Sequence, residues 1–516
     1  MSKVREPLSS APSGHPRAPS AGAKSVEETY RKLDQVEHIL LRPDTYIGSI
    51  QRVTQLMWLL DAPTRRIVSR TASFVPGLYK IFDEILVNAA DNKQRDAGMT
   101  LLRVEIDAVS GSLSVWNNGR GVPVQVHRDH GVYVPELIFG HLLTSSNYDD
   151  AERKVTGGRN GYGAKLANIF STEFTVETAD GARGLRFRQT FRDNMGVRGA
   201  PAITPYAGTD FTSVSFRPDL ARFKMDGLDA DTVALLSKRV YDMAGVLGAR
   251  GVSVSLNGER VPCSSFQEYV LLYVDADAAS SATAQASPLR VWERVNARWE
   301  VCASLSDGSF TQASFVNAIA TTKGGQHVAH VVDQLAAAVC EHVAKKNKGT
   351  EVKPQHVRNH ISIFVNCQIE NPAFDSQTKE TLTTRPKDFG SECVLSERFI
   401  KTFLESGVVE RVLSWARFKA TAELQRAGGG KKAAARLLDV PKLDDANLAG
   451  GAAHGHECTL ILTEGDSAKS LAVAGLAVVG RDRFGVFPLK GKLLNVREAS
   501  HKAIMGNAEI QSKCGA

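Results

Sequence analysis

The chain has 516 residues, is 43% hydrophobic and 23% charged, and carries a formal net charge of +7 at pH 7. This length is too great for one compact core and predicts about three domains, in a composition that is ordinary for a globular protein. No apolar run is long enough to span a membrane, which argues against a membrane protein. The seven cysteines include no C-x-x-C pair, which argues against a disulfide framework or a zinc site. The mild positive charge permits nucleic-acid binding.

The N-terminal stretch, residues 1–25, is rich in Ser, Pro, Ala and Gly and has no apolar periodicity. This pattern predicts a disordered tail. A cleaved transit peptide is the alternative, because the stretch has four basic residues and one acidic residue, although its prolines disfavour an amphipathic helix.

Residues 26–250 alternate helical and strand patterns with glycine punctuation. Alternating apolar residues predict one β-hairpin over 102–119 and a second over 174–191. The segment 78–96, "LYKIFDEILVNAADNKQRD", has apolar residues at helical spacing and predicts a buried helix.

Three polar side chains, Glu84, Asn88 and Asn92, recur every four residues on another face of that helix. A Glu can deprotonate water, and an Asn oxygen suits a hard cation such as Mg²⁺. A merely solvated polar face is the alternative for this helix taken alone.

Two glycine-rich stretches follow. "VWNNGRGVP" (115–123) is a strand that ends in a glycine turn, and "VTGGRNGYGAKLANIF" (155–170) leads into an apolar helix. Free backbone N–H groups before a helix suit an anion, often a phosphate, although a plain structural turn fits either stretch alone.

The helix with Glu and Asn, the N-x-G-x-G turn and the G-x-x-G-x-G loop, in this order, resemble the GHKL ATPases. The resemblance implies a GHKL (Bergerat) sandwich in which Glu84 activates water, Asn88 binds Mg²⁺, and Asn117 binds adenine where most of the family has Asp. It also implies a phosphate cradle made of Gly158, Arg159, Asn160, Gly161, Tyr162, Gly163, Ala164 and Lys165.

Longer segments resemble eukaryotic DNA topoisomerase II, a type IIA family, from Tyr30 to Ile510. They include "FDEILVNAADN", "LLTSSNYDD", "SFVNAIATTKGG", "NPAFDSQTKETLTTRPKDFGS" and "LILTEGDSAKSLAV". The resemblance implies an α+β protein with a GHKL ATPase domain at 26–250, a ribosomal-protein-S5-like transducer domain at 251–425, a linker at 426–454 and an incomplete Toprim α/β domain at 455–516.

The same resemblance adds site residues. Ser145, Ser146 and Asn147 would line the ATP pocket, and the transducer would contribute Gln377, Thr378 and Lys379, with Lys379 on the terminal phosphate. Tyr30 would lie in an arm that crosses to the second subunit of a homodimer.

The predicted contacts to double-stranded DNA lie in two regions. Lys345, Lys346 and Lys348 belong to a basic run at 344–358 for which a solvated loop is the alternative. In the Toprim segment the resemblance makes Glu464 a ligand of the cleavage Mg²⁺ and brings Lys490 and Lys492 close to DNA.

The resemblance implies an ATP-dependent type II DNA topoisomerase, most simply nuclear, with an organellar copy as the alternative. The sequence has no tyrosine in a suitable context for DNA cleavage and no D-x-D pair after Glu464, so we expect this portion to hydrolyse ATP and close as a clamp without cutting DNA. The alternatives are an ATP-gated GHKL clamp without cleavage activity, which Glu464 argues against, and a non-catalytic interaction protein, which Glu84, Asn88 and Lys379 argue against.

Overall fold

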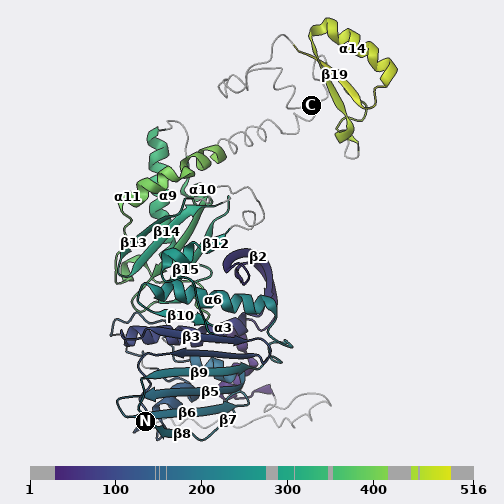
Figure 1. Ribbon diagram of the computed structural model, residues 1–516. Helices are drawn as coiled ribbons and strands as arrows, with labels where there is room; N and C mark the ends of the chain where they lie inside the picture. Colours follow the sequence, from purple (N-terminus) through teal and green to yellow (C-terminus); the bar gives the residue numbers. More distant parts are fainter. Residues whose placement is uncertain are drawn as a thin grey trace, which may run out of the picture. The chain divides into compact units, whose positions relative to one another are not determined.

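The computed structural model describes residues 29–145, 147–149, 151–158, 160–274, 289–306, 308–346, 352–416, 443–450 and 454–489. The chain divides into two compact units, residues 1–412 and 413–516 (Figure 1). The predictions for the tail, for most of the linker, and for Ser146, Arg159, Lys348, Lys490 and Lys492 fall outside the described residues.

The first unit is built around a sheet of nine described strands with the order β11-β10-β3-β4-β9-β5-β6-β7, in which β8 also pairs with β6. Both predicted hairpins are confirmed, because β3 pairs with β4 and β5 with β6, each antiparallel. The strands are β3 (Leu101–Asp107), β4 (Ser112–Asn117), β5 (Ser171–Asp180), β6 (Leu185–Arg192), β7 (Val197–Arg198), β8 (Ala202–Pro205), β9 (Phe211–Pro218), β10 (Ser253–Leu256) and β11 (Glu259–Arg260).

Strands β10 and β11 extend this sheet beyond residue 250, where the sequence predicts a second domain to begin. Strand β10 pairs in parallel with β3, far away in the sequence. The place of β10 in the first sheet depends on a pairing that local sequence patterns do not reveal.

Helices cover one face of this sheet. Helix α3 (Pro76–Arg95) contacts β4 and β9, and α6 (Ala230–Gly248) contacts β3 and β10. Two short helices pack beside them over β5, α4 (Val134–Gly140) and α5 (Gly163–Ile169). The remaining helices of this region are α2 (Gln35–Leu41), a 3-10 turn η1 (Pro43–Thr45) and α7 (Phe266–Val270).

Helix α3 forms as predicted over 78–96. Proline occupies its first turn, where the absent N–H costs nothing, and the helix ends at Arg95 before Gly98. Its apolar side chains, such as Phe82 and Leu86, are fully buried and each stabilises the fold by about 2 kcal/mol.

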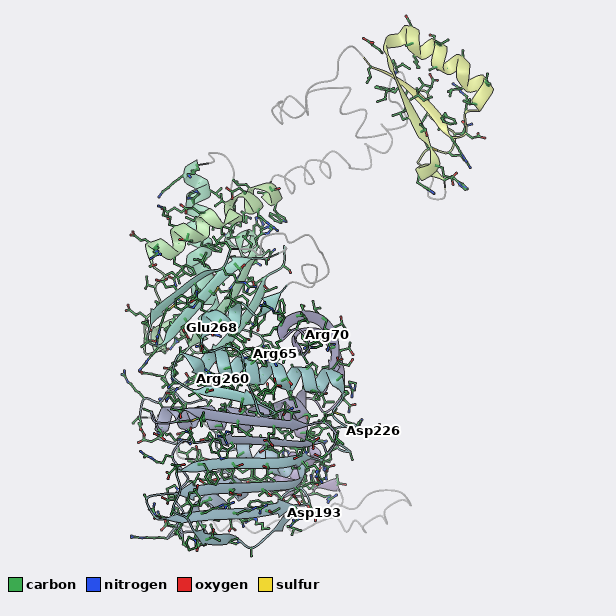
Figure 2. The ribbon with its side chains drawn as sticks, in the orientation of Figure 1. Arg65, Arg70, Asp193, Asp226, Arg260 and Glu268 are labelled. Atoms are coloured by element: carbon green, nitrogen blue, oxygen red, sulfur yellow. The ribbon has the colours of Figure 1, made fainter. Side chains whose placement is uncertain are left out.

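A small sheet stands beside α6. It contains β1 (Val53–Asp61), β2 (Arg66–Phe74) and β12 (Tyr273–Val274). Ion pairs tie the β1–β2 hairpin to its surroundings, since Arg65 meets Glu259 at 2.6 Å and Arg70 meets Asp231 at 2.6 Å (both arginines are labelled in Figure 2).

The transducer region contains a five-stranded sheet with the order β13-β14-β17-β15-β16. Its strands are β13 (Val291–Asn296), β14 (Trp299–Leu305), β15 (Thr311–Val316), β16 (Ile319–Ala320) and β17 (Ile361–Cys367). Its helices are α9 (Gln326–Lys346), α10 (Pro354–Arg358), η2 (Pro386–Asp388), α11 (Glu397–Phe403) and η3 (Leu404–Val408). Phe315 and Phe364 of this sheet belong to the same hydrophobic core as α3 and α6, so the two regions are packed as one unit.

The second unit contains a 3-10 turn η5 (Gly455–Glu457) and a strand–helix–strand motif. Strand β18 (Thr459–Glu464) pairs in parallel with β19 (Phe484–Leu489), and α14 (Gly465–Val479) connects them. Strand β18 is only partly covered by the described residues, since Leu460 is 40% and Leu462 is 43% exposed. The assignment of this unit to a Toprim domain stays a prediction.

Among the described residues, none of the helices is both long and apolar enough to cross a bilayer.

Candidate active site

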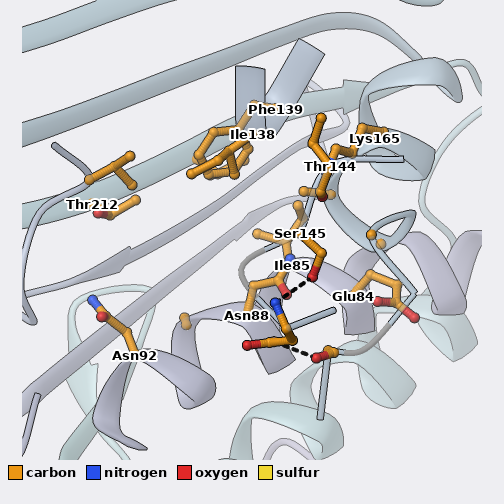
Figure 3. Close-up of a pocket in the computed structure, with 18 of the residues that line it drawn as sticks. Glu84, Ile85, Asn88, Asn92, Ile138, Phe139, Thr144, Ser145, Lys165 and Thr212 are labelled. Atoms are coloured by element: carbon orange, nitrogen blue, oxygen red, sulfur yellow. Dashed lines mark hydrogen bonds between the residues drawn. The ribbon is translucent and has the colours of Figure 1, made fainter. Parts of the chain in front are cut away.

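A cavity of about 330 Å³ lies between α3, the end of β4, the loop before α5 and a loop of the transducer region. Figure 3 shows Glu84, Asn88 and Asn92 placed one after another along α3 at this cavity. The predicted site residues that line it are Glu84, Asn88, Asn117, Ser145, Asn147, Gly158, Asn160, Gly161, Tyr162, Gly163, Ala164, Lys165, Gln377 and Lys379.

Glu84 is 2% exposed and contacts two lysines. Lys80 Nζ lies 2.7 Å from Glu84 Oε1, and Lys379 Nζ lies 3.3 Å from the same oxygen. Burial by itself would raise the pKa of Glu84, but Lys379 and Lys80 outweigh it and lower this pKa to about 2. Glu84 is therefore a carboxylate at neutral pH.

Lys379 reaches Glu84 from the transducer region, 295 residues along the chain. Its backbone has φ of 61°, in the left-handed region that costs a residue with a side chain about 1–2 kcal/mol. Strain of this kind persists only where surrounding structure imposes it, often at functional sites. Thr378, by contrast, is not among the residues that line the cavity, and its hydroxyl lies 2.7 Å from Ser376 Oγ.

Asn88 is half-buried one turn after Glu84 and lines the cavity. Its Oδ1 lies within 3.5 Å of the space that a side chain at Gly158 would occupy. An amide oxygen that faces a cavity in this way can take part in binding Mg²⁺, which usually keeps several waters and substrate oxygens as its other ligands.

Asn117 is held by its neighbours. Its Oδ1 accepts from Asn92 Nδ2 at 2.8 Å and from the N–H of Gly119 at 3.2 Å, while its Nδ2 donates to Thr212 O at 3.4 Å. Asn92, predicted as part of the polar face of α3, thus orients Asn117 at the end of the cavity away from Glu84.

The loop before α5 approaches α3 closely at a glycine. A Cβ at Gly163 would lie 2.1 Å from Glu84 Oε2, so only glycine fits there without moving the carboxylate. Asn147 Nδ2 donates to Gly158 O at 2.5 Å, and Asn160 Nδ2 donates to Gln377 Oε1 at 2.8 Å. The loop is therefore joined to both neighbouring segments.

Lys165 enters the same cavity from the first turn of α5. Its side chain is 3% exposed, and Nζ donates to Thr144 O at 2.7 Å. Burial lowers the pKa of Lys165 to about 8, so this amine remains largely protonated at pH 7.

Two residues of the site are not predicted from the sequence. Asp91 accepts hydrogen bonds from the N–H groups of Gly157 at 2.7 Å and Gly158 at 2.8 Å, which fixes the start of the loop on α3. Lys80 holds Glu84 from one turn earlier on the same helix. The i,i+4 spacing could have indicated Lys80, whereas Asp91 contacts residues that are 66 positions away.

The predicted DNA and cleavage-metal residues lie elsewhere in the structure. Lys345 and Lys346 form the last turn of α9, and Lys345 pairs with Glu341 at 2.6 Å with both side chains exposed. Glu464 is exposed at the end of β18. The described residues contain no group of three or more His, Cys, Asp or Glu side chains that could hold a metal ion.

Family models match the two regions that build the cavity. The model described as histidine kinase-, DNA gyrase B-, and HSP90-like ATPase matches residues 75–195, and the model described as DNA gyrase B matches residues 265–429. The fold and the site therefore define an ATPase region of the GHKL class followed by a gyrase B-type transducer fold.

Comparisons with individual relatives and solved structures identify the family more narrowly than the family models do. The chain is 58% identical over 490 residues to DNA topoisomerase 2-beta of Gallus gallus, covering 95% of this chain and 30% of that protein. It is 56% identical to DNA topoisomerase 2 of Drosophila melanogaster, covering 95% of this chain and 34% of that protein.

The ATPase and transducer domains of DNA topoisomerase II from Balamuthia mandrillaris match with a TM-score of 0.72 and 51% identity, over 77% of this chain and all of that one. The ATPase region of Saccharomyces cerevisiae topoisomerase II matches with a TM-score of 0.71 and 48% identity, over 76% of this chain and all of that one. The chain belongs to the DNA topoisomerase II family. It spans about a third of the length of these curated relatives.

Proposed function

We propose that this chain binds ATP with Mg²⁺ in the cavity and hydrolyses it, as the ATPase and clamp part of a type II DNA topoisomerase. The observation that carries the proposal is the contact of Lys379 with Glu84 across the two regions of the first unit, at 3.3 Å. A candidate base and a cation from the other region lie together beside a loop that suits phosphates.

The charges give this pair a nucleotide-dependent role. A terminal phosphate in the cavity would compete with Glu84 for the ammonium group of Lys379. Once Lys379 contacts the phosphate, Glu84 loses the cation that most strongly lowers its pKa, and its affinity for a proton rises. Glu84 would then accept a proton from the attacking water, while Lys80 keeps the carboxylate in place.

The remaining residues would bind and orient the nucleotide. Asn88 would hold Mg²⁺, which neutralises phosphate charge, and Asn117 and Thr212 lie where the adenine would be bound. Ser145, Asn147 and the loop from Gly158 to Lys165 would enclose the phosphates, in part through backbone N–H groups.

The proposal includes the whole enzyme's partners. Double-stranded DNA would pass over the basic end of α9, and a second copy of the chain would dimerise through the ATPase domain, where the 80% exposed Tyr30 is available for contact. Glu464 would provide one ligand of a second Mg²⁺ site used in DNA cleavage, and Gln377 and Thr378 would accompany Lys379 in the transducer loop. We also propose a nuclear location, which the family likeness supports.

Steady-state ATP hydrolysis of the Glu84→Gln variant tests the proposal. We expect kcat to fall at least about 100-fold while nucleotide binding is retained, because a neutral amide cannot accept the proton. Glu105→Gln, an exposed position on β3, is the matched control and should leave the rate unchanged. An unchanged rate in Glu84→Gln would reject this role for Glu84.

A further inference from the structure

A turn of the transducer sheet reaches the start of the loop at the cavity. Asn317 and Ala318 connect β15 to β16, and both have positive φ angles, 50° and 65°. Asn adopts this left-handed conformation readily, but Ala does so only where its surroundings enforce it. The turn is therefore held in place by specific contacts.

The Asn317 side chain makes three of these contacts and is 3% exposed. Its Nδ2 donates to Thr156 O at 3.2 Å and to Ile369 O at 2.9 Å, and its Oδ1 accepts from the N–H of Ile369 at 2.9 Å. Thr156 directly precedes Gly157 and Gly158, whose N–H groups Asp91 binds. The first residues of the loop are thus fixed by the transducer turn on one side and by α3 on the other.

A buried arginine joins the same turn to the helix that carries Glu84. Arg239 of α6 is fully buried. Its Nε donates to Asp83 Oδ1 at 2.7 Å, and its Nη2 donates to Ala318 O. Asp83 adjoins Glu84 in the chain. The turn is consequently linked to the loop directly and to α3 through Arg239, without involving Lys379.

Apolar side chains of α3 and β16 pack around Gly157 at the start of the loop. A Cβ added at Gly157 would lie 2.7 Å from Val87 of α3 and 3.1 Å from Ile319 of β16. This spacing leaves no room for a side chain at position 157, so the backbone at the start of the loop lies close to both the transducer sheet and α3.

We propose that Asn317 is a positioning residue for the nucleotide loop and that the 317–318 turn is a second connection between the transducer region and the ATP site, separate from Lys379. The inference rests on the proposed ATPase function. Asn317 touches neither water nor phosphate in this role. It sets where Gly157 and Gly158 lie, and with them the loop that would enclose the triphosphate.

Asn317→Gly tests this role because glycine accepts the left-handed backbone and removes only the side-chain amide. Asn257→Gly is a matched control, since Asn257 also has a positive φ of 50° in a tight hairpin and bonds the backbone of Ile106 through its side chain. If Asn317→Gly does not fold, Asn317→Asp replaces it, because Asp keeps the acceptor for Ile369 N–H but loses the donor to Thr156.

Two measurements on the whole chain decide the proposal. We expect Asn317→Gly to raise the KM for Mg²⁺–ATP about 10-fold with kcat within about twofold, and to speed amide exchange at Gly157 and Gly158 more than about 10-fold. Asn257→Gly should change neither. A KM within twofold of the wild type, or an equal effect in both variants, would overturn the positioning role.

Failure of the ATPase proposal remains distinguishable from failure of this one. If the wild-type chain hydrolyses no ATP, the proposed function fails, and the exchange measurement alone decides the role of Asn317. Faster exchange at Gly157 and Gly158 in Asn317→Gly alone then supports positioning of the loop, and unchanged exchange overturns it.

Discussion

At the scale of single residues, the ionisation of Glu84 is controlled by its neighbours. Burial opposes the charge of Glu84, and Lys379 and Lys80 provide it with two cations. Because Lys80 is on the same helix and Lys379 comes from another region, only the contact with Lys379 would change if the two regions moved relative to each other.

A Lys379→Met variant tests this control through acid stability. The lowered pKa of Glu84 means that its contribution to stability is present above about pH 4.5 and is lost as pH falls toward 2. Without Lys379 the pKa rises and part of this contribution, about 1–3 kcal/mol, is lost. The free energies of unfolding in urea should therefore differ most between variant and wild type above pH 5. This difference should shrink as the pH is lowered.

The control for that experiment is the same substitution in a Glu84→Gln background. Glutamine does not titrate, so the pH-dependent part of the difference should vanish there. If the difference between Lys379→Met and wild type is the same at pH 3 and pH 7, Lys379 does not govern the charge of Glu84.

At the scale of elements, α3 and α6 are joined by buried charges. Arg239 is fully buried against Asp83, with Asp242 at 3.8 Å, and although burial disfavours its charge, Asp83 raises the pKa of Arg239 above its ordinary value. Removing one member of a buried ion pair leaves the charge of the other member buried without a partner of opposite charge.

Arg239→Met should therefore destabilise the first unit by about 3–5 kcal/mol, since Asp83 would lose its main partner inside the protein. Adding Asp83→Asn should recover part of the loss. Denaturant unfolding of both variants measures these effects, and a loss below about 1 kcal/mol in Arg239→Met would mean that water or another group compensates Asp83.

The elements with strong local patterns are the ones that the sequence predicts. The apolar spacing in α3, the two hairpins around glycine turns and the loop before α5 all appear as expected. Glu84 and Asn88 could be predicted to face one site because helical geometry alone places them one turn apart.

The contacts that complete the site could not be predicted in this way. Asp91 binds Gly157 and Gly158, and Arg239 binds Asp83 at a separation of 156 residues, so neither pairing leaves a periodic pattern. The same reason explains β10, whose strand pattern is local but whose parallel partner β3 is distant. The left-handed Ala318 is likewise set by tertiary contacts rather than by its own preference.

At the scale of the whole molecule, the ATPase and transducer regions share one core, and the transducer contributes side chains to the cavity. A nucleotide that draws Lys379 away from Glu84 changes contacts between these regions. The basic end of α9 belongs to the same unit, so the proposed contact with DNA would lie in the unit that also contains the cavity.

Replacing Lys345, Lys346 and Lys348 with Ala should weaken the stimulation of ATP hydrolysis by DNA and reduce its salt dependence. Each lysine that no longer neutralises a DNA phosphate lowers the slope of log affinity against log salt by about 0.9. The exposed pair of Lys345 with Glu341 contributes little to stability, so folding should be retained.

A charge-matched control replaces Arg186, Arg188 and Arg192, which lie on β6 with exposed or partly exposed side chains, with Ala. This control should keep the stimulation. Full stimulation of ATP hydrolysis by DNA in the lysine variant at moderate salt would show that these lysines do not contact DNA as proposed.

The central claim is that one cavity binds a magnesium-bound triphosphate between α3, the loop from Gly158 to Lys165, and Lys379. A crystal structure of the chain with Mg²⁺ and a non-hydrolysable ATP analogue tests it most directly. We expect the metal beside Asn88 and the Lys379 ammonium group on the terminal phosphate, no longer on Glu84. An analogue bound elsewhere, or a Lys379 that stays on Glu84 while the analogue is in the cavity, would contradict it.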